Sequence, residues 1–392
     1  MENEECTMNN VHWKKVRLGD VGEIISGGTP STSNEAFWDG GVLFVTPLDL
    51  GRKKDISSTI RTISELGVLN SSANKIKMNS LAVSTRAPIG LMSIVNEDFT
   101  TNQGCKSIQF FENFDSQFFY YYLSYNVEHL RRYGQGTTFM EISKTDFANI
   151  EISVPSLPAQ RRIAAILSAA DKMIEQTRQL IVKYKSIKQG LMEDLLKPKE
   201  GWKKVKLGDC CITELGKTLD EGRNTGEYRP YLCALNVLWG KIDRTTIKQM
   251  RIEDDELNRY AVKKGDLLVC EGGEIGRCAI WDYDDTMYYQ NALHRVRFFN
   301  GYDSMFFMYL LCYYNDLNLL EQHGKGLTIK HLNQTSFRSI PVSVPDLSEQ
   351  RRIAKILSGI DRKIEAEEKV LEKYTQLKKG LMEKLLNEKE II

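Results

Sequence analysis

The sequence contains no continuous run of about 18 apolar residues, so a membrane-spanning helix is not expected. Its first ten residues are acidic and polar, and they lack the apolar centre of a secretory signal. Proline is scarce, with 9 in 392 residues, and the eight cysteines include no Cys-x-x-Cys pair. We therefore expect a cytoplasmic protein with buried, reduced thiols, and neither a disulfide framework nor a zinc site.

An excess of basic charge is also absent, since 53 Lys and Arg stand against 52 Asp and Glu. Proteins that bind nucleic acid are often basic, so a net charge of +1 argues against that class. The distribution of charge over one face matters more than the net charge, so a neutral chain is not excluded from binding nucleic acid. The length and the 42% hydrophobic content suffice for about two domains with their own cores.

Recognisable catalytic motifs are missing as well. The chain has no Asn-Pro-Pro-Tyr or Asn-Pro-Pro-Phe methylation motif, no Gly-x-Ser-x-Gly, and no Gly-x-Gly-x-x-Gly at a strand–helix junction. Its five histidines show no metal-ligand spacing, and residues 324–328 lack the spacing of an ATP-binding loop. We expect no catalytic residue, no metal site and no cofactor in this chain.

One long segment is present twice. Residues 155–197 and 345–387 match without a gap at about half of their positions. Residues 12–20 recur at 201–209, and the spacing between matched segments stays near 190. A repeat of this kind outranks local signals when architecture is inferred. The chain is predicted to be a tandem of two units, about 13–200 and 202–392, each a mixed body followed by one long helix.

Each repeated segment carries the apolar pattern of a paired helix. Apolar residues recur every seven positions over four or more heptads, and some 38 residues would form a rod of roughly 57 Å. Such a helix needs a partner, and the nearest matching stripe is the other copy, which predicts an antiparallel pair. Gly190 and Gly380 inside the stripe suggest a close backbone approach or a bend. The residues assigned to helix pairing or partner binding are Ile163, Ile166, Met173, Leu180, Ile187, Leu191, Ile353, Ile356, Val370, Leu377 and Leu381.

The bodies are rich in short stretches of β-branched and aromatic residues bounded by turns, which predicts strands. Each body also has one helix dense in aromatic residues, at 116–132 and 304–322, and we expect these rings to be core rather than stacking platforms for bases. The fold class is therefore α+β. Two mixed α/β domains, residues 13–154 and 202–344, are separated by an antiparallel pair of long coiled-coil helices, residues 155–197 and 345–390, as a pseudo-two-fold tandem repeat. The expected strands are residues 41–46, 81–85, 107–111, 150–154, 231–234, 266–270, 278–281 and 294–299.

Several short strings of the first body occur in one known family in the same order. They are residues 26–30 (SGGTP), 37–40 (FWDG), 84–90 (STRAPIG), 101–104 (TNQG), 136–142 (GTTFMEI) and 155–164 (PSLPAQRRIA), the last partly repeated at 350–354. On these residues the whole chain resembles the specificity subunit of a type I restriction-modification system. The second body lacks the Gly-Gly-Thr-Pro and Arg-Ala-Pro-Ile-Gly strings.

The resemblance implies that each body is a target-recognition domain that reads one half of an asymmetric bipartite site in double-stranded DNA. The helices would set the spacer and dock two modification (methyltransferase) subunits. S-adenosylmethionine, ATP and Mg would act on partner subunits, which are the modification subunits and the motor-nuclease restriction subunits. Different strings in the two bodies imply different half-sites.

Base reading uses Arg, Lys, Asn and Gln on loops, and phosphate binding uses basic side chains, hydroxyls and backbone amides. For Arg86 we favour DNA contact over an internal ion pair. For residues 102–103 and 290–291, DNA contact and a structural role in a turn or a buried amide network are equally open. For residues 161–162 and 351–352, contact with phosphate, with a partner or only with solvent remains open. The predicted DNA-binding residues are Gly28, Thr29, Arg86, Asn102, Gln103, Gln135, Thr137, Thr138, Lys144, Arg223, Glu271, Arg277, Gln290, Asn291, Arg295, Lys325, Thr328 and Lys330.

Two other functions compete with this hypothesis. The first alternative is a fused nuclease or methyltransferase with an unrecognised active site. The second is a scaffold whose bodies bind proteins. Methyl transfer or cleavage by the chain alone would favour the first, and indifference to duplex DNA at low salt would favour the second.

Overall fold

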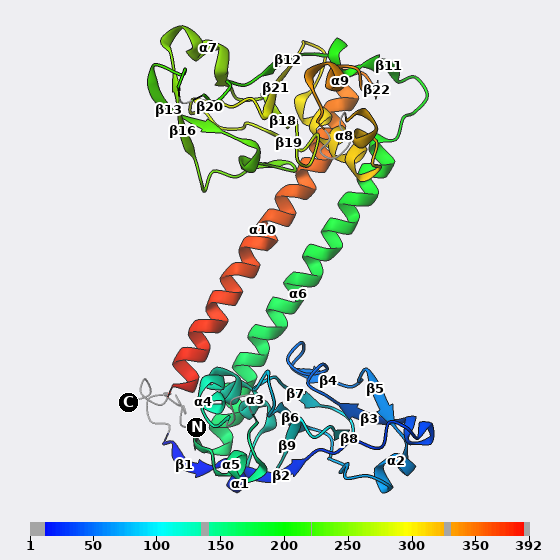
Figure 1. Ribbon diagram of the computed structural model, residues 1–392, viewed down its shortest axis with the longest axis vertical. Helices are drawn as coiled ribbons and strands as arrows, with labels where there is room; N and C mark the ends of the chain where they lie inside the picture. The colour runs from blue at the N-terminus through cyan, green and yellow to red at the C-terminus, as the bar shows by residue number, and fades with distance from the viewer. Residues whose placement is uncertain (1–11, 135–140, 221, 325–330, 388–392) are drawn as a thin grey trace, which may run out of the picture. The chain divides into compact units, whose positions relative to one another are not determined.

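The computed structural model describes residues 12–134, 141–220, 222–324 and 331–387. The chain divides into two units, residues 1–178 with 370–392, and residues 179–369. Each unit contains one α+β body and parts of both long helices (Figure 1). The two units are described separately below.

The body of the first unit has two main sheets, in the orders β2-β9-β6-β7-β4 and β5-β3-β8. The pairs β2–β9, β9–β6 and β6–β7 are antiparallel, whereas β3–β8 is parallel. A third pair, β1–β10, closes the body next to the long helix. The strands are β1 (Lys14–Arg17), β2 (Gly22–Ser26), β3 (Trp38–Val45), β4 (Asp55–Ile56), β5 (Arg61–Ile63), β6 (Ser80–Ser84), β7 (Met92–Val95), β8 (Phe99–Thr101), β9 (Cys105–Phe110) and β10 (Glu151–Val154). The short helices are α1 (Leu18–Val21), α2 (Glu65–Leu69), α3 (Ser116–Tyr125), α4 (Val127–Arg131) and α5 (Lys144–Asn149).

The body of the second unit repeats this plan with the sheets β12-β21-β18-β19 and β16-β13-β20-β17. Its pair β11–β22 corresponds to β1–β10, and β14–β15 is an added hairpin. The strands are β11 (Lys203–Lys206), β12 (Cys211–Leu215), β13 (Glu227–Leu232), β14 (Val237–Leu238), β15 (Lys241–Ile242), β16 (Lys248–Ile252), β17 (Ala261–Val262), β18 (Leu267–Cys270), β19 (Cys278–Ile280), β20 (Met287–Tyr289), β21 (Leu293–Phe298) and β22 (Pro341–Val344). The short helices are α7 (Leu257–Tyr260), α8 (Ser304–Asp316) and α9 (Gln334–Arg338).

The predicted strands all overlap observed ones, and both aromatic-rich helices are present but end early. In the first body the helix breaks at Asn126, whose side chain donates to the Tyr122 carbonyl and separates α3 from α4. In the second body α8 ends at Asp316, before a short 3-10 turn over Leu320–His323. A carboxylate caps each helix, since Asp115 accepts from the Phe118 amide and Asp303 from the Phe306 amide.

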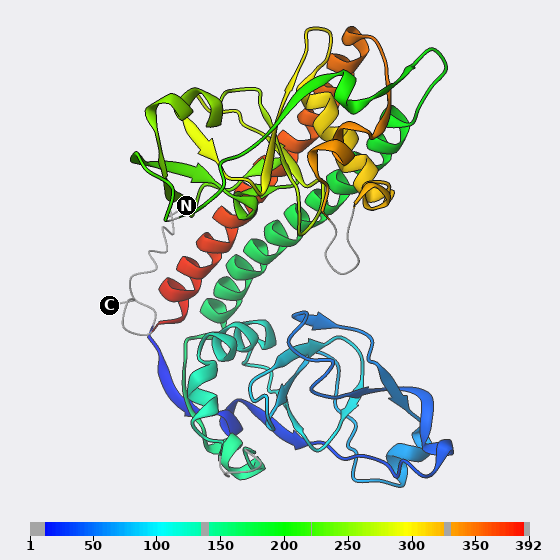
Figure 2. The same ribbon diagram turned by 45° about the horizontal axis from the view of Figure 1, so that its top comes forward.

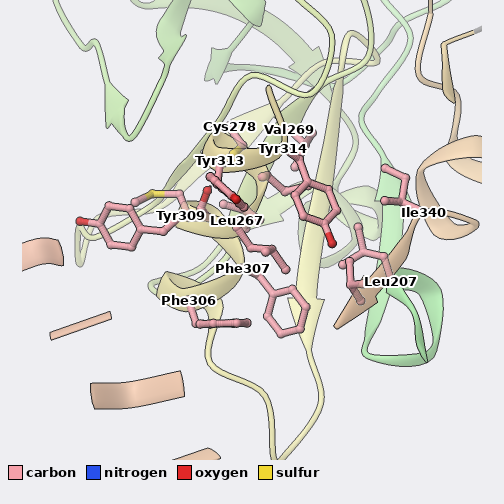
Figure 3. Packing of buried hydrophobic residues seen from close by; sticks show 14 of the residues in the cluster. Leu207, Leu267, Val269, Cys278, Phe306, Phe307, Tyr309, Tyr313, Tyr314 and Ile340 are labelled. Carbon is pink, nitrogen blue, oxygen red and sulfur yellow. Dashed lines mark hydrogen bonds between the residues drawn. The ribbon is translucent and has the colours of Figure 1, made fainter. Parts of the chain in front are cut away.

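The aromatic side chains of these helices form core, as predicted. Phe118 and Phe119 on α3, and Phe306 and Phe307 on α8, are fully buried. Figure 3 shows the second-unit cluster, in which the α8 rings pack against Leu267 and Val269 of β18. Burying such rings contributes about 2 to 3 kcal/mol each, so they stabilise the bodies and are not available to stack on bases.

Two helices of 40 residues each, α6 (Leu157–Leu196) and α10 (Leu347–Leu386), match the predicted repeats. In the first unit the start of α6 packs against the end of α10, with Ile163 and Leu167 in one cluster with Leu385 and Leu386. In the second unit the end of α6, at Met192 and Leu196, packs against the start of α10 at Ile353 and Leu357. Figure 2 shows α8, in gold, beside these second-unit segments. The pairing is antiparallel in both units, as predicted.

The centre of the pairing face differs from the prediction by one residue. On α6, six buried residues alternate steps of four and three: Ile163, Leu167, Ala170, Ile174, Thr177 and Ile181. The prediction named Ile163 correctly, but it then named residues 166, 173, 180 and 187 in place of 167, 174 and 181, and one residue is about 100° of helix rotation. Met173 and Ile187 are therefore 38% and 39% exposed, and on α10 Leu377 is 51% exposed. Those three assignments to helix pairing are wrong.

The remaining predicted pairing residues contribute to the packing to different degrees. Ile163 and Ile353 are buried at the seam. The others are partly buried at its flanks: Ile166, Leu180, Leu191, Ile356, Val370 and Leu381. A Cβ built on Gly190 or Gly380 meets nothing within 4 Å, so the suggested close backbone approach is wrong.

A polar network with the same three residue types accompanies the seam in each unit. In the first unit Tyr121 donates to Asp171 at 2.6 Å, and Asp171 also pairs with Lys378 of α10 at 2.6 Å. In the second unit Tyr309 donates to Asp361 at 2.6 Å, and Asp361 pairs with Lys188 of α6 at 2.7 Å. Partly buried charges of this kind cost free energy when they are mispaired, so they select one register.

A buried glutamine joins each body to its own helix. Gln160 accepts from the Asp115 amide at 2.9 Å and donates to the Pro155 carbonyl at 2.9 Å. Gln350 repeats both bonds, with the Asp303 amide at 2.8 Å and the Pro345 carbonyl at 2.9 Å. Each side chain is 1% exposed, so the amide is fully used inside the joint.

The start of α10 confirms only half of the predicted capping box. Asp346 accepts from the Glu349 amide at 3.0 Å, as expected for an N-cap. The Glu349 carboxylate does not return to the Asp346 amide, because it pairs with Arg352 at 2.6 Å. Arg352 is thus held on the helix surface.

The cysteines agree with reduced, buried thiols. Of the seven in the described residues, six are buried and Cys312 is half-buried, and none is paired. Burial raises the pKa of Cys105 to about 12 and that of Cys210 to about 11, so both remain protonated thiols. Cys6 lies outside the described residues. Among the described helices, none is both long enough and apolar enough to cross a membrane.

Candidate nucleic-acid interface

The loops at one end of the sheets form the same frame in both bodies. In the first body, five backbone hydrogen bonds join the loops after β2, β6 and β8, the end of β3 and the segment before α5. In the second body, five corresponding bonds join the loops after β12, β18 and β20, the end of β13 and the segment before α9. In the first body they are Gly27 N to Cys105 O, Gly28 N to Thr101 O, Asn102 N to Val45 O, Thr85 N to Gly104 O and Ile142 N to Thr85 O. In the second they are Gly216 N to Leu293 O, Lys217 N to Tyr289 O, Gln290 N to Leu232 O, Glu271 N to Ala292 O and Leu332 N to Glu271 O.

One glycine in each frame is required by close packing. A Cβ on Gly27 would lie 2.0 Å from the Asn102 carbonyl oxygen, and one on Gly216 would lie 2.3 Å from that of Gln290. No real Cβ contact is that short, so a larger residue would push the two loops apart. The second body lacks the Gly-Gly-Thr-Pro string, yet Gly216 takes the place of Gly27 in its frame.

Because the frame is made of backbone atoms, it defines which side chains correspond. Asn102 corresponds to Gln290, Gln103 to Asn291, Arg86 to Gly272, Glu141 to His331, and Lys106 to His294. The frame is therefore constant while the side chains on it differ. This is the arrangement needed to present two different sets of hydrogen-bond donors and acceptors from one scaffold.

In the first body a charged group occupies the frame. Arg86 Nε lies 2.8 Å from Glu141, and Lys106 Nζ lies 3.6 Å from the other oxygen of the same carboxylate. Lys106 is buried, whereas the Arg86 side chain is 47% exposed. Arg86 thus makes the internal ion pair that competed with DNA contact, and because nearly half of its side chain remains exposed, a guanine edge or a phosphate could still bind the guanidinium.

The neighbouring loop presents an amide beside Arg86. Gln103 is exposed, and its carbonyl oxygen accepts from the Thr29 hydroxyl, which leaves the Gln103 NH₂ group as an outward donor. The Asn102 carbonyl instead accepts from the Gly104 amide at 3.1 Å, so this side chain closes a turn. Of the predicted pair, Gln103 is the one available to a ligand.

Two first-body predictions have different outcomes. Gly28 is buried, its N–H already donates to Thr101 at 2.9 Å, and a Cβ there would lie 2.2 Å from the Ser72 hydroxyl. The assignment of Gly28 to DNA is therefore wrong. Lys144 is exposed at the first position of α5, where its ammonium can reach a phosphate.

In the second body two of the three predicted arginines, Arg295 and Arg277, bond to groups inside the body. Arg295 is 2% exposed, donates to Glu214 and to the Ala261 carbonyl, and lies over the Tyr289 ring at 5.3 Å. Arg295 therefore cannot reach DNA, and its prediction was wrong. The Gln-Asn turn just before it suggested a loop, whereas Arg295 belongs to a buried strand.

Arg277 is likewise occupied. It donates to the Ala234 carbonyl at 2.8 Å and pairs with Glu274 at 3.2 Å, with its side chain only 20% exposed. The prediction that Arg277 reads a base is wrong, because its side chain holds the loop after β13. Arg223 is the opposite case, because its side chain is 89% exposed and pairs loosely with Asp220 at 3.5 Å.

Other second-body candidates lie on the frame itself. Gln290, Asn291 and Glu271 are half-buried on its loops, where their outer atoms remain accessible. Lys217 stands where the first body has Gly28, and it is buried against Glu256 and the Tyr260 ring. Burial opposes ionisation of Glu256, but the hydrogen bond from Lys217 prevails and lowers the pKa of that carboxyl.

Buried His294 lies under the second frame, at the place of Lys106. Its Nε2 is 2.8 Å from the Leu332 carbonyl, and its ring stacks on Phe337 at 6.0 Å. Burial lowers the pKa of His294, so the ring is neutral and Nε2 donates to the carbonyl. The first frame therefore rests on a cation, and the second rests on a neutral ring.

The predicted phosphate-binding residues in the two glycine-containing strings cannot be assigned a place. Gln135, Thr137, Thr138, Lys325, Thr328 and Lys330 lie outside the described residues. Within the described part of the chain, no group of three or more His, Cys, Asp and Glu side chains could hold a metal ion.

Substitution of Arg295 separates a structural role from a reading role. We expect Arg295→Ala to lower the free energy of unfolding by about 2 to 3 kcal/mol, because it removes a buried side chain that bonds the Ala261 carbonyl and lies over the Tyr289 ring. Denaturant unfolding of the purified chain measures this. Arg223→Ala is the control, with an expected change within about 0.5 kcal/mol. A stable Arg295→Ala chain with altered DNA preference would contradict the assignment.

Comparisons with known proteins give a consistent result. A family model described as "Type I restriction modification DNA specificity domain" matches residues 10–184 and 199–376. The MjaVIII specificity subunit of Methanocaldococcus jannaschii is 24% identical over 402 residues, which cover 96% of this chain and 92% of that protein. The MjaIX specificity subunit of the same organism is 32% identical over 170 residues, which cover 42% of this chain and only 39% of that protein.

Solved structures share the fold over nearly the full chain. The S subunit of a type I restriction-modification system from M. genitalium has a TM-score of 0.63 at 18% identity, with 97% of both chains covered. The HsdS subunit from Thermoanaerobacter tengcongensis has a TM-score of 0.51 at 16% identity, with 95% of this chain and 96% of that chain covered. At these identities the likeness concerns the fold alone.

Proposed function

Because the chain belongs to the family of type I restriction-modification DNA specificity proteins, we propose that it is the subunit that recognises DNA in such a system. The observation that carries the proposal is the loop frame, which is built twice from matched backbone hydrogen bonds and carries different side chains each time. One body would read one half of a bipartite site, and the other body the second half. The subunit itself would be non-catalytic.

The exposed groups of the first frame suit base recognition. Arg86 and Gln103 present nitrogen donors from two loops that are hydrogen-bonded to each other, and such donors match acceptors on guanine or adenine in the major groove. Glu141 fixes the Arg86 side chain by the bond to Nε, so less conformational entropy is lost when DNA binds. Lys144 and Arg223 would add phosphate contacts, which position the protein but carry no sequence information.

Partner subunits complete the proposed complex. Two modification subunits would dock on the paired helices and bring S-adenosylmethionine, and motor-nuclease subunits would bring ATP and Mg. Met173, Ile187 and Leu377 are exposed on the helices and are therefore available to such partners. We place the subunit in the cytoplasm, where the DNA is.

The test of this function is duplex binding by the purified full-length chain. We expect retention of a randomised duplex pool at low salt, and recovery of a split motif on repeated selection. The logarithm of the binding constant should fall linearly with the logarithm of salt concentration, with a slope of about −0.9 per phosphate contact.

The same preparation distinguishes the competing functions. Incubated with labelled S-adenosylmethionine and DNA, or with Mg and DNA, the chain alone should neither transfer methyl groups nor cleave. Robust transfer or cleavage would establish an enzyme. Failure to retain any duplex at low salt would instead favour a protein-binding scaffold.

A further inference from the structure

We propose that His331 reads a base in the half-site of the second body, at the place where the first body uses Arg86 and Glu141. The inference rests on the proposed DNA-recognition function and adds a specificity-determining residue to it. In the second body, two of the three predicted arginines, Arg277 and Arg295, are committed to internal bonds.

The matched frame locates His331 without reference to its side chain. Ile142 donates to the Thr85 carbonyl in the first body, and Leu332 donates to the Glu271 carbonyl in the second. The residue before each donor is therefore equivalent, which pairs Glu141 with His331. The residue after each acceptor is equivalent too, which pairs Arg86 with Gly272.

The side chains show why this exchange works. In the first body, Arg86 and Glu141 form a β-bridge and an ion pair across the frame. In the second body the arginine is replaced by glycine, and a Cβ at Gly272 would lie only 2.9 Å from Nδ1 of His331. The imidazole thus lies directly over Gly272, in space that a larger residue would fill. The absence of a side chain at Gly272 therefore makes room for the imidazole of His331.

The exposed imidazole is available to a ligand. His331 is exposed, and its ring makes no hydrogen bond or ion pair with any residue that the structure describes. The buried histidine of this region, His294, contrasts with it, since its Nε2 is bound to a carbonyl at 2.8 Å. A neutral imidazole offers one donor and one acceptor, and a donor nitrogen suits the N7 acceptor of a purine in the major groove.

The neighbouring groups complete a reading surface. Asn291, at the place of Gln103, carries an amide that can bond the N6 and N7 atoms of adenine. The first body would thus read with a guanidinium and an amide, and the second with an imidazole and an amide. The two half-sites would differ mainly at the base that Arg86 contacts in one and His331 contacts in the other.

Duplex selection with the full-length chain tests this proposal. We expect His331→Ala to lose preference at one position of the second half of the selected motif, with affinity for the wild-type sequence reduced about 10- to 100-fold. The first half should be unchanged. Arg86→Ala should give the reciprocal result, with loss confined to the first half. Lys264→Ala is the control. Lys264 lies in the turn before β18, at the end of the strand away from the frame, so this substitution should change neither half.

A transplant provides the stricter test. The double variant Gly272→Arg with His331→Glu installs the Arg–Glu pair of the first body in the second frame. We expect the altered position to acquire the base preference that Arg86 confers on the first half. If the double variant does not fold, His331→Ala and the conservative His331→Gln decide the question, with unfolding curves as the check on folding.

The outcomes separate this inference from the function it depends on. If the wild-type chain selects no split motif, the proposed function itself fails. If the wild type selects a split motif and His331→Ala selects the same motif with unchanged affinity, only the assignment of His331 is overturned. A general loss of affinity for all sequences, with the motif unchanged, would likewise overturn it, since that result indicates a phosphate contact.

Discussion

Replacing residues 13–154 with the first body of another family member is expected to change one half of the recognised sequence and leave the other half untouched. The physical reason is that each body has its own sheets and loop frame, and that every hydrogen bond of a frame joins two residues of the same body. Gln160 would join the new body to the helix through backbone atoms alone, since its partners are the Asp115 amide and the Pro155 carbonyl. The measurement is the motif selected by the chimeric chain, or the motif methylated in cells that supply the partners.

The reciprocal chimera, with residues 202–344 exchanged, is the matched control. It should alter the opposite half of the motif. Changes in both halves from either exchange would show that the two bodies read DNA jointly, and would contradict the assignment of one half-site to each frame.

The second large effect is expected at the helix seam. Leu167→Asp should lower the free energy of unfolding by about 4 kcal/mol or more, because Leu167 is fully buried in a cluster with Leu385 and Leu386 of α10. A carboxylate there has no partner, and the two helices cannot close around it. Denaturant unfolding followed by helical circular dichroism measures the loss.

Met173→Asp on the same helix is the control, since it introduces the same charge on a side chain that is 38% exposed. Its expected cost is below about 1 kcal/mol. Equal destabilisation by the two substitutions would mean that the seam is centred where the heptad pattern first placed it, and would contradict the burial found here.

Comparison of sequence and structure shows which interactions a pattern can reveal. The strands, the long helices and their antiparallel pairing followed from periodicity and from the repeat, because these features are spread over many residues. The exact seam did not follow, since adjacent apolar residues such as Ile166 and Leu167 fit a seven-residue pattern equally well. Only the facing helix decides between them.

The candidate site was predicted less completely. Arg86 and Gln103 were found because they stand in turns among polar residues, and both are exposed. Arg295 stands in a similar string, but it belongs to β21, whose first four residues are all buried. His331 was missed, because a single histidine between strands carries no signal until the hydrogen bond from Leu332 to Glu271 identifies its counterpart. Matching the two bodies loop by loop, rather than string by string, would have found it.

The backbone construction of the frame has an evolutionary consequence. A scaffold held by main-chain amides tolerates replacement of the residues it displays, so each body is free to acquire new preferences by point mutation or by recombination. Because the two scaffolds vary separately, a population of such genes can encode a number of sequence specificities equal to the product, rather than the sum, of its variant halves. Diversity of targets would then accumulate much faster than diversity of protein sequence.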